Sequence, residues 1–191
     1  KNCLDMCAAP GGKSFQILSK NIEIVLNDKS KKRLEVLKNN LKRLNFKPIV
    51  INCDVKNISL KKKYDFIIID APCSALGTIR KNPDIFFKQN EPNFANLVKT
   101  QKDMLSKATS ILNKKGIILY MVCSFLKEET SNQINNFLRN NKNFTLNNFF
   151  SYKKKLFYKN AIKDNFMLTL PTNFDGFNVD GYYAAFLKKN S

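Results

Sequence analysis

The chain has 191 residues, 43% of them hydrophobic, which is enough for one domain with a proper core. Lysine and arginine number 33 against 15 acidic residues, a net charge of +18 that favours a polyanionic partner such as nucleic acid, although an AT-rich genome would also enrich lysine. Histidine is absent, no Cys-x-x-Cys pair occurs, and no apolar run approaches the roughly 18 residues that span a membrane, so we expect no histidine-dependent triad, no zinc site of the usual kind and no membrane span.

Short apolar runs alternate with helical patterns along the chain. Strands are expected at 3–7, 22–26, 49–51, 66–69, 117–122, 144–146 and 182–187. Helices are expected at 13–18, 31–44, 93–112 and 128–138. This alternation predicts an α/β fold with a mostly parallel, doubly wound sheet. The last two strands have only a loop region between them, so we expect them to pair antiparallel.

Residues with useful chemistry fall at the ends of the expected strands. In open parallel sheets, ligands bind beyond the carboxyl ends of the strands. Five such residues lie at the carboxyl ends of the expected strands, namely Cys7, Asp28, Asp54, Asp70 and Cys123. Their common location predicts that they share one site.

The first loop, "LDMCAAPGGKS", ends like a phosphate-binding P-loop. A P-loop has Gly six positions before the lysine, whereas this chain has Cys7. Pro10 removes an N–H group that a phosphate cradle would use. Asp28, about 20 residues after the start of the loop, suits hydrogen bonds to ribose hydroxyls. The loop therefore favours a nucleoside without a triphosphate, while a plain strand–helix turn stays open.

Two cysteine segments, "DAPCSALGTIRKNPD" and "YMVCS", follow strands that are expected to be neighbours. Their cysteines, Cys73 and Cys123, can therefore converge on one pocket. Cysteine is also a common small core residue, which is the interpretation we prefer for Cys3 and Cys53.

Five segments occur in the order found in RNA (cytosine-5) methyltransferases, namely "LDMCAAPGGKS", "NDKSKKRLEVLKNNLKRL", "DAPCSALGTIRKNPDIFF", "MVCSFLKEET" and "DGYYAAFLKK". The chain resembles this family over nearly its whole length and looks most like the bacterial RsmB type, which acts on small-subunit ribosomal RNA. The resemblance implies a Rossmann-like class I S-adenosylmethionine-dependent methyltransferase fold with an antiparallel last strand. It also implies that residues 1–191 form one methyltransferase catalytic domain.

By this resemblance the cofactor is S-adenosyl-L-methionine and no metal is used. The loop 7–13 would contact its methionine portion, Asp28 the ribose and Asp54 the adenine edge. The expected cofactor-binding residues are Cys7, Ala8, Ala9, Pro10, Gly11, Gly12, Lys13, Asp28, Arg33, Asp54 and Asp70.

Cytosine C5 is a poor nucleophile, so the expected chemistry starts with a thiolate that adds to C6. The resemblance makes Cys123 the nucleophile and gives Cys73 the release of the methylated base. Cytosine-5 DNA methyltransferases attack with a Pro-Cys cysteine, which keeps Cys73 as the rival nucleophile. Asp70 is expected to polarise N3 and the exocyclic amine, with a capping role for the loop as its alternative.

Several features depart from this family or lie beside its motifs. Val122 stands where the family usually has Thr, and the RNA-binding segments that usually precede the first motif are missing from a chain that begins with Lys1. We therefore expect the chain to be a fragment of a longer protein. We also expect it to be monomeric. Its odd number of cysteines and the lack of a signal-peptide pattern favour a reducing, cytoplasmic setting. Arg80, Lys81 and Asp84 are expected on the substrate side or in a solvated loop, and Glu128 and Glu129 in the first turn of a helix, in a structural role.

Three other functions remain open from the sequence. The substrate can be tRNA instead of ribosomal RNA. The protein can be a P-loop-like NTPase, or a non-catalytic RNA-binding module that keeps the fold.

Overall fold

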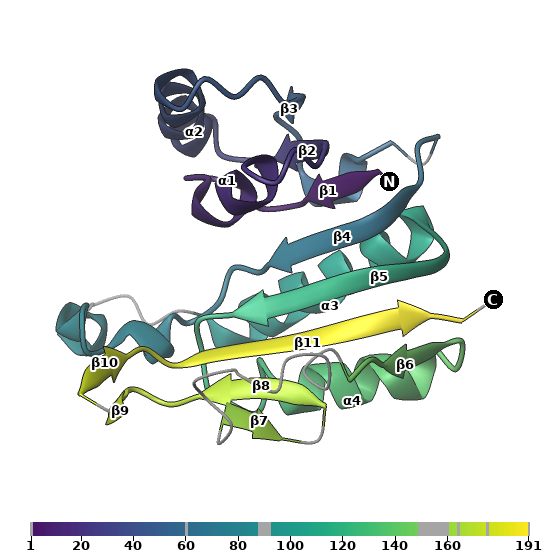
Figure 1. The fold of residues 1–191 in the computed structure, drawn as a ribbon. Helices are drawn as coiled ribbons and strands as arrows, with labels where there is room; N and C mark the ends of the chain where they lie inside the picture. Colours follow the sequence, from purple (N-terminus) through teal and green to yellow (C-terminus); the bar gives the residue numbers. More distant parts are fainter. Residues whose placement is uncertain are drawn as a thin grey trace.

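The computed structural model describes residues 2–59, 61–87, 93–148, 161–163, 165–174 and 176–190. Within these residues, nine strands form a twisted sheet in the order β3-β2-β1-β4-β5-β11-β8-β7, with β6 also paired to β11 (Figure 1). A separate hairpin joins β9 and β10. No helix in this part of the chain is long and apolar enough to cross a membrane.

The elements follow one another in the alternation that the sequence predicts. The strands are β1 (Cys3–Asp5), β2 (Ile24–Asn27), β3 (Val50–Ile51), β4 (Tyr64–Asp70), β5 (Leu112–Val122), β6 (Phe144–Leu146), β7 (Ile162–Lys163), β8 (Phe166–Thr169), β9 (Thr172–Phe174), β10 (Phe177–Val179) and β11 (Tyr182–Lys189). The helices are α1 (Gly12–Leu18), α2 (Lys31–Arg43), α3 (Phe94–Ile111) and α4 (Ser131–Asn140), with 3-10 turns η1 (Val55–Asn57), η2 (Leu76–Thr78) and η3 (Pro83–Phe87).

The first five strands are parallel and the last one is not. Strands β3, β2, β1, β4 and β5 pair in parallel, and β11 pairs antiparallel with both β5 and β6. Both expectations, the doubly wound parallel sheet and the antiparallel last strand, are confirmed. The chain order reverses between β1 and β4, and this reversal opens a crevice at the carboxyl ends of the strands.

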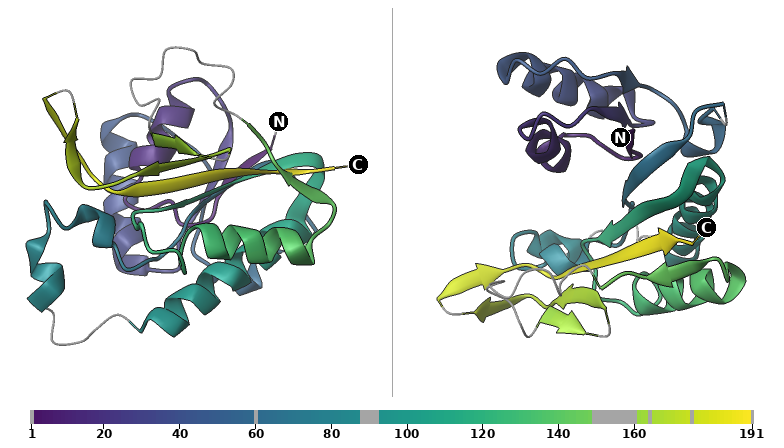
Figure 2. Two further views of the ribbon diagram at one scale, coloured as in Figure 1. Left: turned by 90° about the horizontal axis from the view of Figure 1, so that it is seen from below. Right: turned by 45° about the vertical axis from the view of Figure 1, so that its right-hand side comes forward.

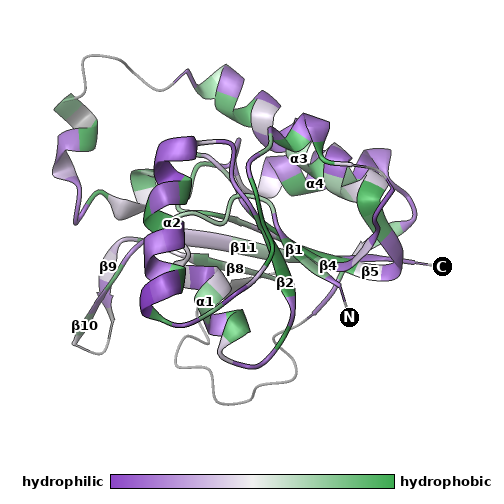
Figure 3. Ribbon diagram, turned by 90° about the horizontal axis from the view of Figure 1, so that it is seen from above, coloured by the Kyte–Doolittle hydropathy of each residue, from purple (hydrophilic) through white to green (hydrophobic). Residues whose placement is uncertain are grey.

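Alternate side chains of the strands bury opposite faces of the sheet. Ile67 and Ile69 pack in the core beneath α3 and α4, whereas Ile68 packs against α2 with Leu34 and Leu37. Figure 2 shows α3 and α4 together on one side of the sheet, and Figure 3 shows hydrophobic and hydrophilic residues alternating along α2. Apolar side chains repeat every two residues in the strands and about every 3.6 residues in the helices. Both faces of the sheet are therefore packed against apolar faces of helices.

Two parts of the sheet differ from the sequence-based expectation. β5 begins at Leu112 and not at residue 117, because Tyr64 pairs with Leu112 and the next pair is Phe66 with Ile117, so the intervening residues bulge out. Lys115, with φ of 59°, lies within this bulge. The expected loop region between β6 and β11 contains β7 to β10, and β8 adds to the main sheet beside β11.

The turn η2 is held very close to the start of β11. Gly77 N–H donates to the Cys123 carbonyl at 3.0 Å, and Gly181 N–H donates to the Gly77 carbonyl at 2.7 Å. A Cβ atom on Gly77 would lie 1.9 Å from the Gly181 carbonyl oxygen, which is backbone and cannot swing aside. Only glycine fits at this contact.

Replacing Gly77 with alanine is therefore expected to lower the free energy of unfolding by about 2 kcal/mol or more, because the backbone must separate at η2. Gly12→Ala is the matched control, since a Cβ atom there meets nothing within 4 Å. Its stability should stay within about 1 kcal/mol of the wild type. Urea unfolding of the two variants measures the difference, and equal midpoints would contradict the steric account.

Candidate functional site

The carboxyl ends of β1, β2, β4 and β5 surround a cavity of about 350 Å³. Apolar atoms of Met6, Val55 and Met104 line part of it. The structure also brings seven of the sequence-predicted site residues into its wall, which are Cys7, Asp28, Arg33, Asp54, Asp70, Cys73 and Cys123.

A second cavity, of about 460 Å³, lies at the opposite, amino ends of the strands. Its wall includes Cys3, Ile24, Ile49 and Lys62. Burial raises the pKa of Cys3 to about 12, which keeps its thiol protonated. We place the candidate site in the first cavity, because the acidic and nucleophilic side chains converge there at the topological switch point.

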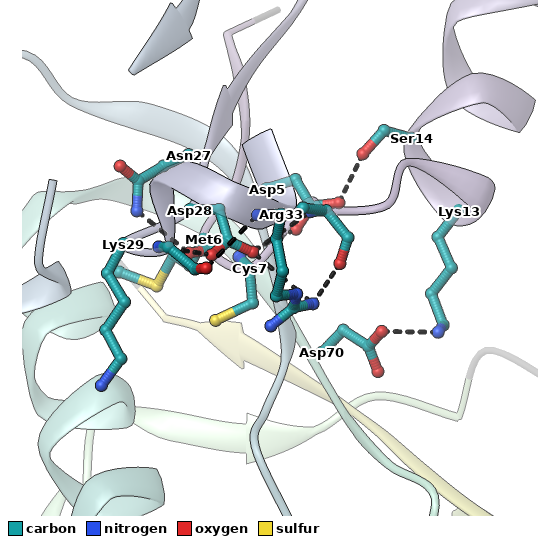
Figure 4. Close-up of polar contacts among 12 residues, drawn as sticks. Asp5, Met6, Cys7, Lys13, Ser14, Asn27, Asp28, Lys29, Arg33 and Asp70 are labelled. Carbon is teal, nitrogen blue, oxygen red and sulfur yellow. Dashed lines mark hydrogen bonds and ion pairs between the residues drawn. The ribbon is translucent and has the colours of Figure 1, made fainter. Parts of the chain in front are cut away.

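Asp5 organises the first loop from the end of β1. Its carboxylate accepts hydrogen bonds from Cys7 N–H at 3.1 Å and from the Ser14 hydroxyl at 2.6 Å (Figure 4). The side chain is buried, and this burial raises the pKa of Asp5 from 3.8 to about 6, although the two hydrogen bonds oppose the shift. Asp5 thus ties β1 to the first turn of α1.

Three N–H groups of the first loop donate hydrogen bonds to other groups of the protein. Cys7 N–H donates to Asp5, Ala8 N–H to the Asn27 carbonyl at 2.8 Å, and Ala9 N–H to the Asp28 carboxylate at 3.3 Å. The backbone of the loop is therefore committed to holding the ends of β1 and β2. Ala8 and Ala9 are buried beside α2, and Cys7 is the residue of this loop that reaches the cavity wall among those described.

Asp28 follows β2 and is almost fully buried. Its two carboxylate oxygens accept from Ser30 N–H at 2.9 Å and from Ala9 N–H at 3.3 Å. The Arg33 guanidinium lies 3.6 Å from the same carboxylate and also donates to the Ala9 carbonyl. Asp54, at the start of η1, is more exposed and accepts from Lys56 N–H at 2.9 Å. Two carboxylates therefore face the cavity from neighbouring strand ends.

Lys13 and Asp70 form an ion pair across the mouth of the site. The Lys13 ammonium lies 2.6 Å from the Asp70 carboxylate, and Figure 4 shows the two side chains pointing toward each other from α1 and β4. Burial disfavours the charge on Lys13, but its hydrogen bond and attraction to Asp70 outweigh this and raise the pKa of Lys13. The Tyr182 ring lies beside it, with the ammonium 6.0 Å from the ring centroid.

The two cysteines meet where β4 and β5 end. Cys73 Sγ and Cys123 Sγ are 3.3 Å apart, and both thiols are free. Their hydrogen bond is the main cause of two opposite shifts, because it raises the pKa of Cys73, which burial raises further, and lowers the pKa of Cys123. Burial raises the pKa of Cys7 to about 12. Of these thiols, Cys123 is the one that the site favours as a thiolate.

The remaining predicted residues surround this centre. Val122 is fully buried in the core beneath α3 and α4 and does not line the cavity. Arg80 and Lys81 both pair with Asp180, at 3.3 and 2.6 Å, and join the loop after Cys73 to the start of β11. Asp84 lies in the first turn of η3.

Sequence reasoning missed two buried acids near the site. Asp5 is a charged residue at the end of an apolar strand, which is a signal that the sequence does carry. Glu129 was expected in the first turn of a helix, which is wrong because α4 begins at Ser131. The Glu129 side chain is instead fully buried and accepts hydrogen bonds from Ser74, next to Cys73.

Known proteins resemble the chain in sequence. The family model described as 16S rRNA methyltransferase RsmB/F matches residues 1–188. A protein of Photorhabdus laumondii called ribosomal RNA small subunit methyltransferase B is 39% identical over 141 residues, or 71% of this chain and 33% of that protein. A protein of the same name from Pasteurella multocida is 36% identical over 198 residues, or 97% of this chain and 42% of that protein. The chain spans about a third to two fifths of the length of these relatives.

Solved structures resemble the chain over nearly its whole length. The crystal structure of NSun6 from Pyrococcus horikoshii with SFG has a TM-score of 0.80 and 27% identity, over 99% of this chain and 48% of that one. The structure of a methyltransferase homologue from Pyrococcus horikoshii has a TM-score of 0.75 and 25% identity, over 99% of this chain and 61% of that one. These neighbours have the fold that the strand order describes.

The raised pKa of Asp5 predicts a pH-dependent stability. Because folding raises this pKa from 3.8 to about 6, the folded state takes up a proton, and wild-type stability falls as the pH rises between these values. Asp5→Asn removes the titration. Between pH 4 and pH 7 its stability should therefore rise relative to the wild type by up to about 3 kcal/mol, at about 1.4 kcal/mol per pKa unit.

Urea unfolding at several pH values measures this difference. Glu23→Gln, which changes an exposed carboxyl to an amide, serves as the control substitution. A constant difference between Asp5→Asn and the wild type across this pH range would contradict the buried-carboxyl account.

Proposed function

The chain belongs to the RsmB/F family of 16S rRNA methyltransferases, and we propose that it transfers a methyl group from S-adenosylmethionine to C5 of a cytosine in small-subunit ribosomal RNA. The observation that carries this proposal is the pair of thiols, Cys73 and Cys123, 3.3 Å apart in the cavity wall. Methylation of a nitrogen or oxygen atom of RNA needs no thiol. Methylation of cytosine C5 needs a nucleophile that first activates the ring.

The cavity fits S-adenosylmethionine by the chemistry of its wall. The Asp28 carboxylate, at the end of β2, is placed where ribose hydroxyls are bound in folds of this kind. Val55 and Met104 give apolar surface for an adenine ring, and Asp54 in the same wall is the acceptor that we assign to its amine. We assign the methionine portion to the side of Cys7 and Asp70. The NSun6 structure contains SFG, an analogue of S-adenosylmethionine, which supports S-adenosylmethionine as the cofactor.

The cofactor supplies an electrophilic methyl group on a sulfonium. The rest of the chemistry belongs to side chains of this chain. The Cys123 thiolate adds to C6 of the cytosine, so that a C–S bond forms and electron density reaches C5. Once C5 is methylated and has lost its proton to a base, the electron pair returns to the ring and the C–S bond breaks. Cys73, which keeps its proton, donates a hydrogen bond to the departing Cys123 sulfur.

Asp70 holds the base during this addition. Its carboxylate can accept a hydrogen bond from the exocyclic amine, which orients the base, and one from N3 once N3 has taken up a proton, which favours attack at C6. Lys13 fixes the orientation of that carboxylate through their 2.6 Å contact. On this proposal the lysine of the Gly-Lys-Ser segment acts on the substrate base indirectly, by holding Asp70.

RNA is the partner that the family and the net charge of +18 both support. The target cytosine must be unpaired or flipped out to bring C6 to Cys123. On this proposal residues 1–191 act as the methyltransferase catalytic domain. Transfer of labelled methyl groups to small-subunit ribosomal RNA, compared with tRNA, tests the substrate class.

Cofactor binding gives a first test. S-adenosylhomocysteine at about 100 times its dissociation constant should stabilise the protein by about 2.7 kcal/mol, whereas ATP with magnesium should not. Asp28→Asn should weaken S-adenosylhomocysteine binding by about tenfold or more, because an amide accepts fewer hydrogen bonds from a ribose diol. Thermal unfolding with and without each ligand measures this. Stabilisation by ATP alone would favour a nucleotide hydrolase.

The two cysteines should have separable effects on methyl transfer. Cys123→Ala is expected to lower transfer from labelled S-adenosylmethionine by roughly two orders of magnitude or more, because the nucleophile is lost. Cys73→Ala is expected to accumulate a covalent protein–RNA adduct on denaturing gels. Cys3→Ala, far from the cavity, is the control and should transfer methyl groups normally.

The same gels separate the rival assignment. An adduct that survives Cys123→Ala but disappears in Cys73→Ala would make Cys73 the nucleophile. Methyl transfer that persists in both variants would contradict thiol chemistry altogether.

A further inference from the structure

Two Cys-Ser pairs lie side by side at the ends of β4 and β5. The thiols of Cys73 and Cys123 are 3.3 Å apart, and the hydroxyls of the next residues, Ser74 and Ser124, are 3.2 Å apart. Both serines are buried. The serine pair therefore joins the two loops next to the thiol contact.

Glu129, in the segment between β5 and α4, binds Ser74 of this pair. One carboxylate oxygen accepts from the Ser74 hydroxyl at 2.6 Å, and the other accepts from Ser74 N–H at 2.9 Å. The side chain is fully buried. Both polar groups of the residue after Cys73 are thus held by one carboxylate, which leaves the Cys73 loop little freedom to rotate.

Gln101, a residue of α3, also restrains the loop that carries Cys73. Gln101 of α3 donates to Glu129 at 3.1 Å and to the Pro72 carbonyl at 3.0 Å. Gln133 of α4 donates to the Gln101 side-chain oxygen at 3.1 Å. Cys73 is therefore fixed on both sides, by Gln101 at the residue before it and by Glu129 at the residue after it.

From this geometry we infer that Glu129 is a positioning residue, which fixes the Cys73 thiol against the Cys123 thiol and thereby decides which of the two thiols is the nucleophile. The assignment of attack to Cys123 and release to Cys73 rests on the proposed function. The contacts that hold the Cys73 loop do not, because they are made within the protein alone.

The Glu129 carboxylate accepts from three donors, two from Ser74 and one from Gln101. A glutamine in its place would keep one oxygen for the Ser74 N–H and Gln101, but its NH2 group would face the Ser74 hydroxyl, which would have to accept instead of donate. The charge also matters, because the pKa of Cys73 is raised mainly by its hydrogen bond to Cys123 and by burial, and further by the nearby carboxylate of Glu129.

Alkylation of the free protein tests the inference without RNA or cofactor. Iodoacetamide at neutral pH should label Cys123 faster than Cys73 in the wild type, as measured by peptide mass spectrometry. In Glu129→Gln the ratio of the two rates should fall roughly tenfold, which corresponds to about one pKa unit of relative thiol acidity. Asp70 and Lys13, which also act on Cys123, are unchanged in this variant.

Glu128→Gln is the matched control, because it makes the same substitution at the neighbouring, exposed residue. Its labelling ratio should equal that of the wild type. Ser74→Ala is a milder variant for the case in which Glu129→Gln fails to fold, since it keeps the Ser74 N–H bond. It should lower the ratio in the same direction by a smaller factor. An unchanged ratio in a folded Glu129→Gln or in Ser74→Ala would overturn the inference.

A second measurement separates this inference from the proposed function. With RNA and S-adenosylmethionine, Glu129→Gln should accumulate the covalent adduct and lose kcat while its KM for the cofactor stays the same. A changed labelling ratio without an adduct in any variant, including Cys73→Ala, would support the positioning role and contradict the cytosine-C5 chemistry. Adducts in Cys73→Ala with normal release in Glu129→Gln would overturn the positioning role alone.

Discussion

The parallel pairing of β4 with β5 sets the geometry on which the site depends. Their register places Asp70 opposite Met121, so the chain leaves both strands at the same edge and the two cysteine loops start side by side. Hydrogen bonds between loop and strand preserve this arrangement beyond the sheet, since Gly77 N–H binds the Cys123 carbonyl and Ser74 binds Ser124. A thiol contact of 3.3 Å across 50 residues of sequence is thus a consequence of sheet register.

Three N–H groups of the first loop are satisfied within the protein and its lysine binds a carboxylate, which supports our proposal over a phosphate site. Consecutive N–H groups of Cys7, Ala8 and Ala9 bind Asp5, Asn27 and Asp28. The lysine that would reach a phosphate binds Asp70 instead. The cavity wall carries carboxylates and thiols beside the cationic side chains Lys29, Arg33 and Lys56, and we propose that it takes a nucleoside with a sulfonium.

Much of this arrangement was predictable from residue patterns. The short apolar runs predict the main strands of the sheet. The rule that ligands bind at the carboxyl ends of parallel strands predicts Asp28, Asp70 and Cys123 as site residues from the sequence alone. The strands β7 to β10 were missed because they are short, and β8 and β10 lack the alternating burial that marks a strand with one buried face. Glu129 was missed for a different reason. A glutamate before an amphipathic helix looks like a favourable helix-dipole charge, and only tertiary packing shows that it turns inward to Ser74.

The central claim is that the methyl group goes to C5 of a cytosine, and release of the C5 hydrogen measures this most directly. Small-subunit ribosomal RNA made with tritium at cytosine C5 would be incubated with the protein and S-adenosylmethionine. The account predicts that tritium enters water in step with methyl transfer, and that both stop in Cys123→Ala. Methyl transfer without tritium release would place the methyl group elsewhere on the RNA and contradict the account.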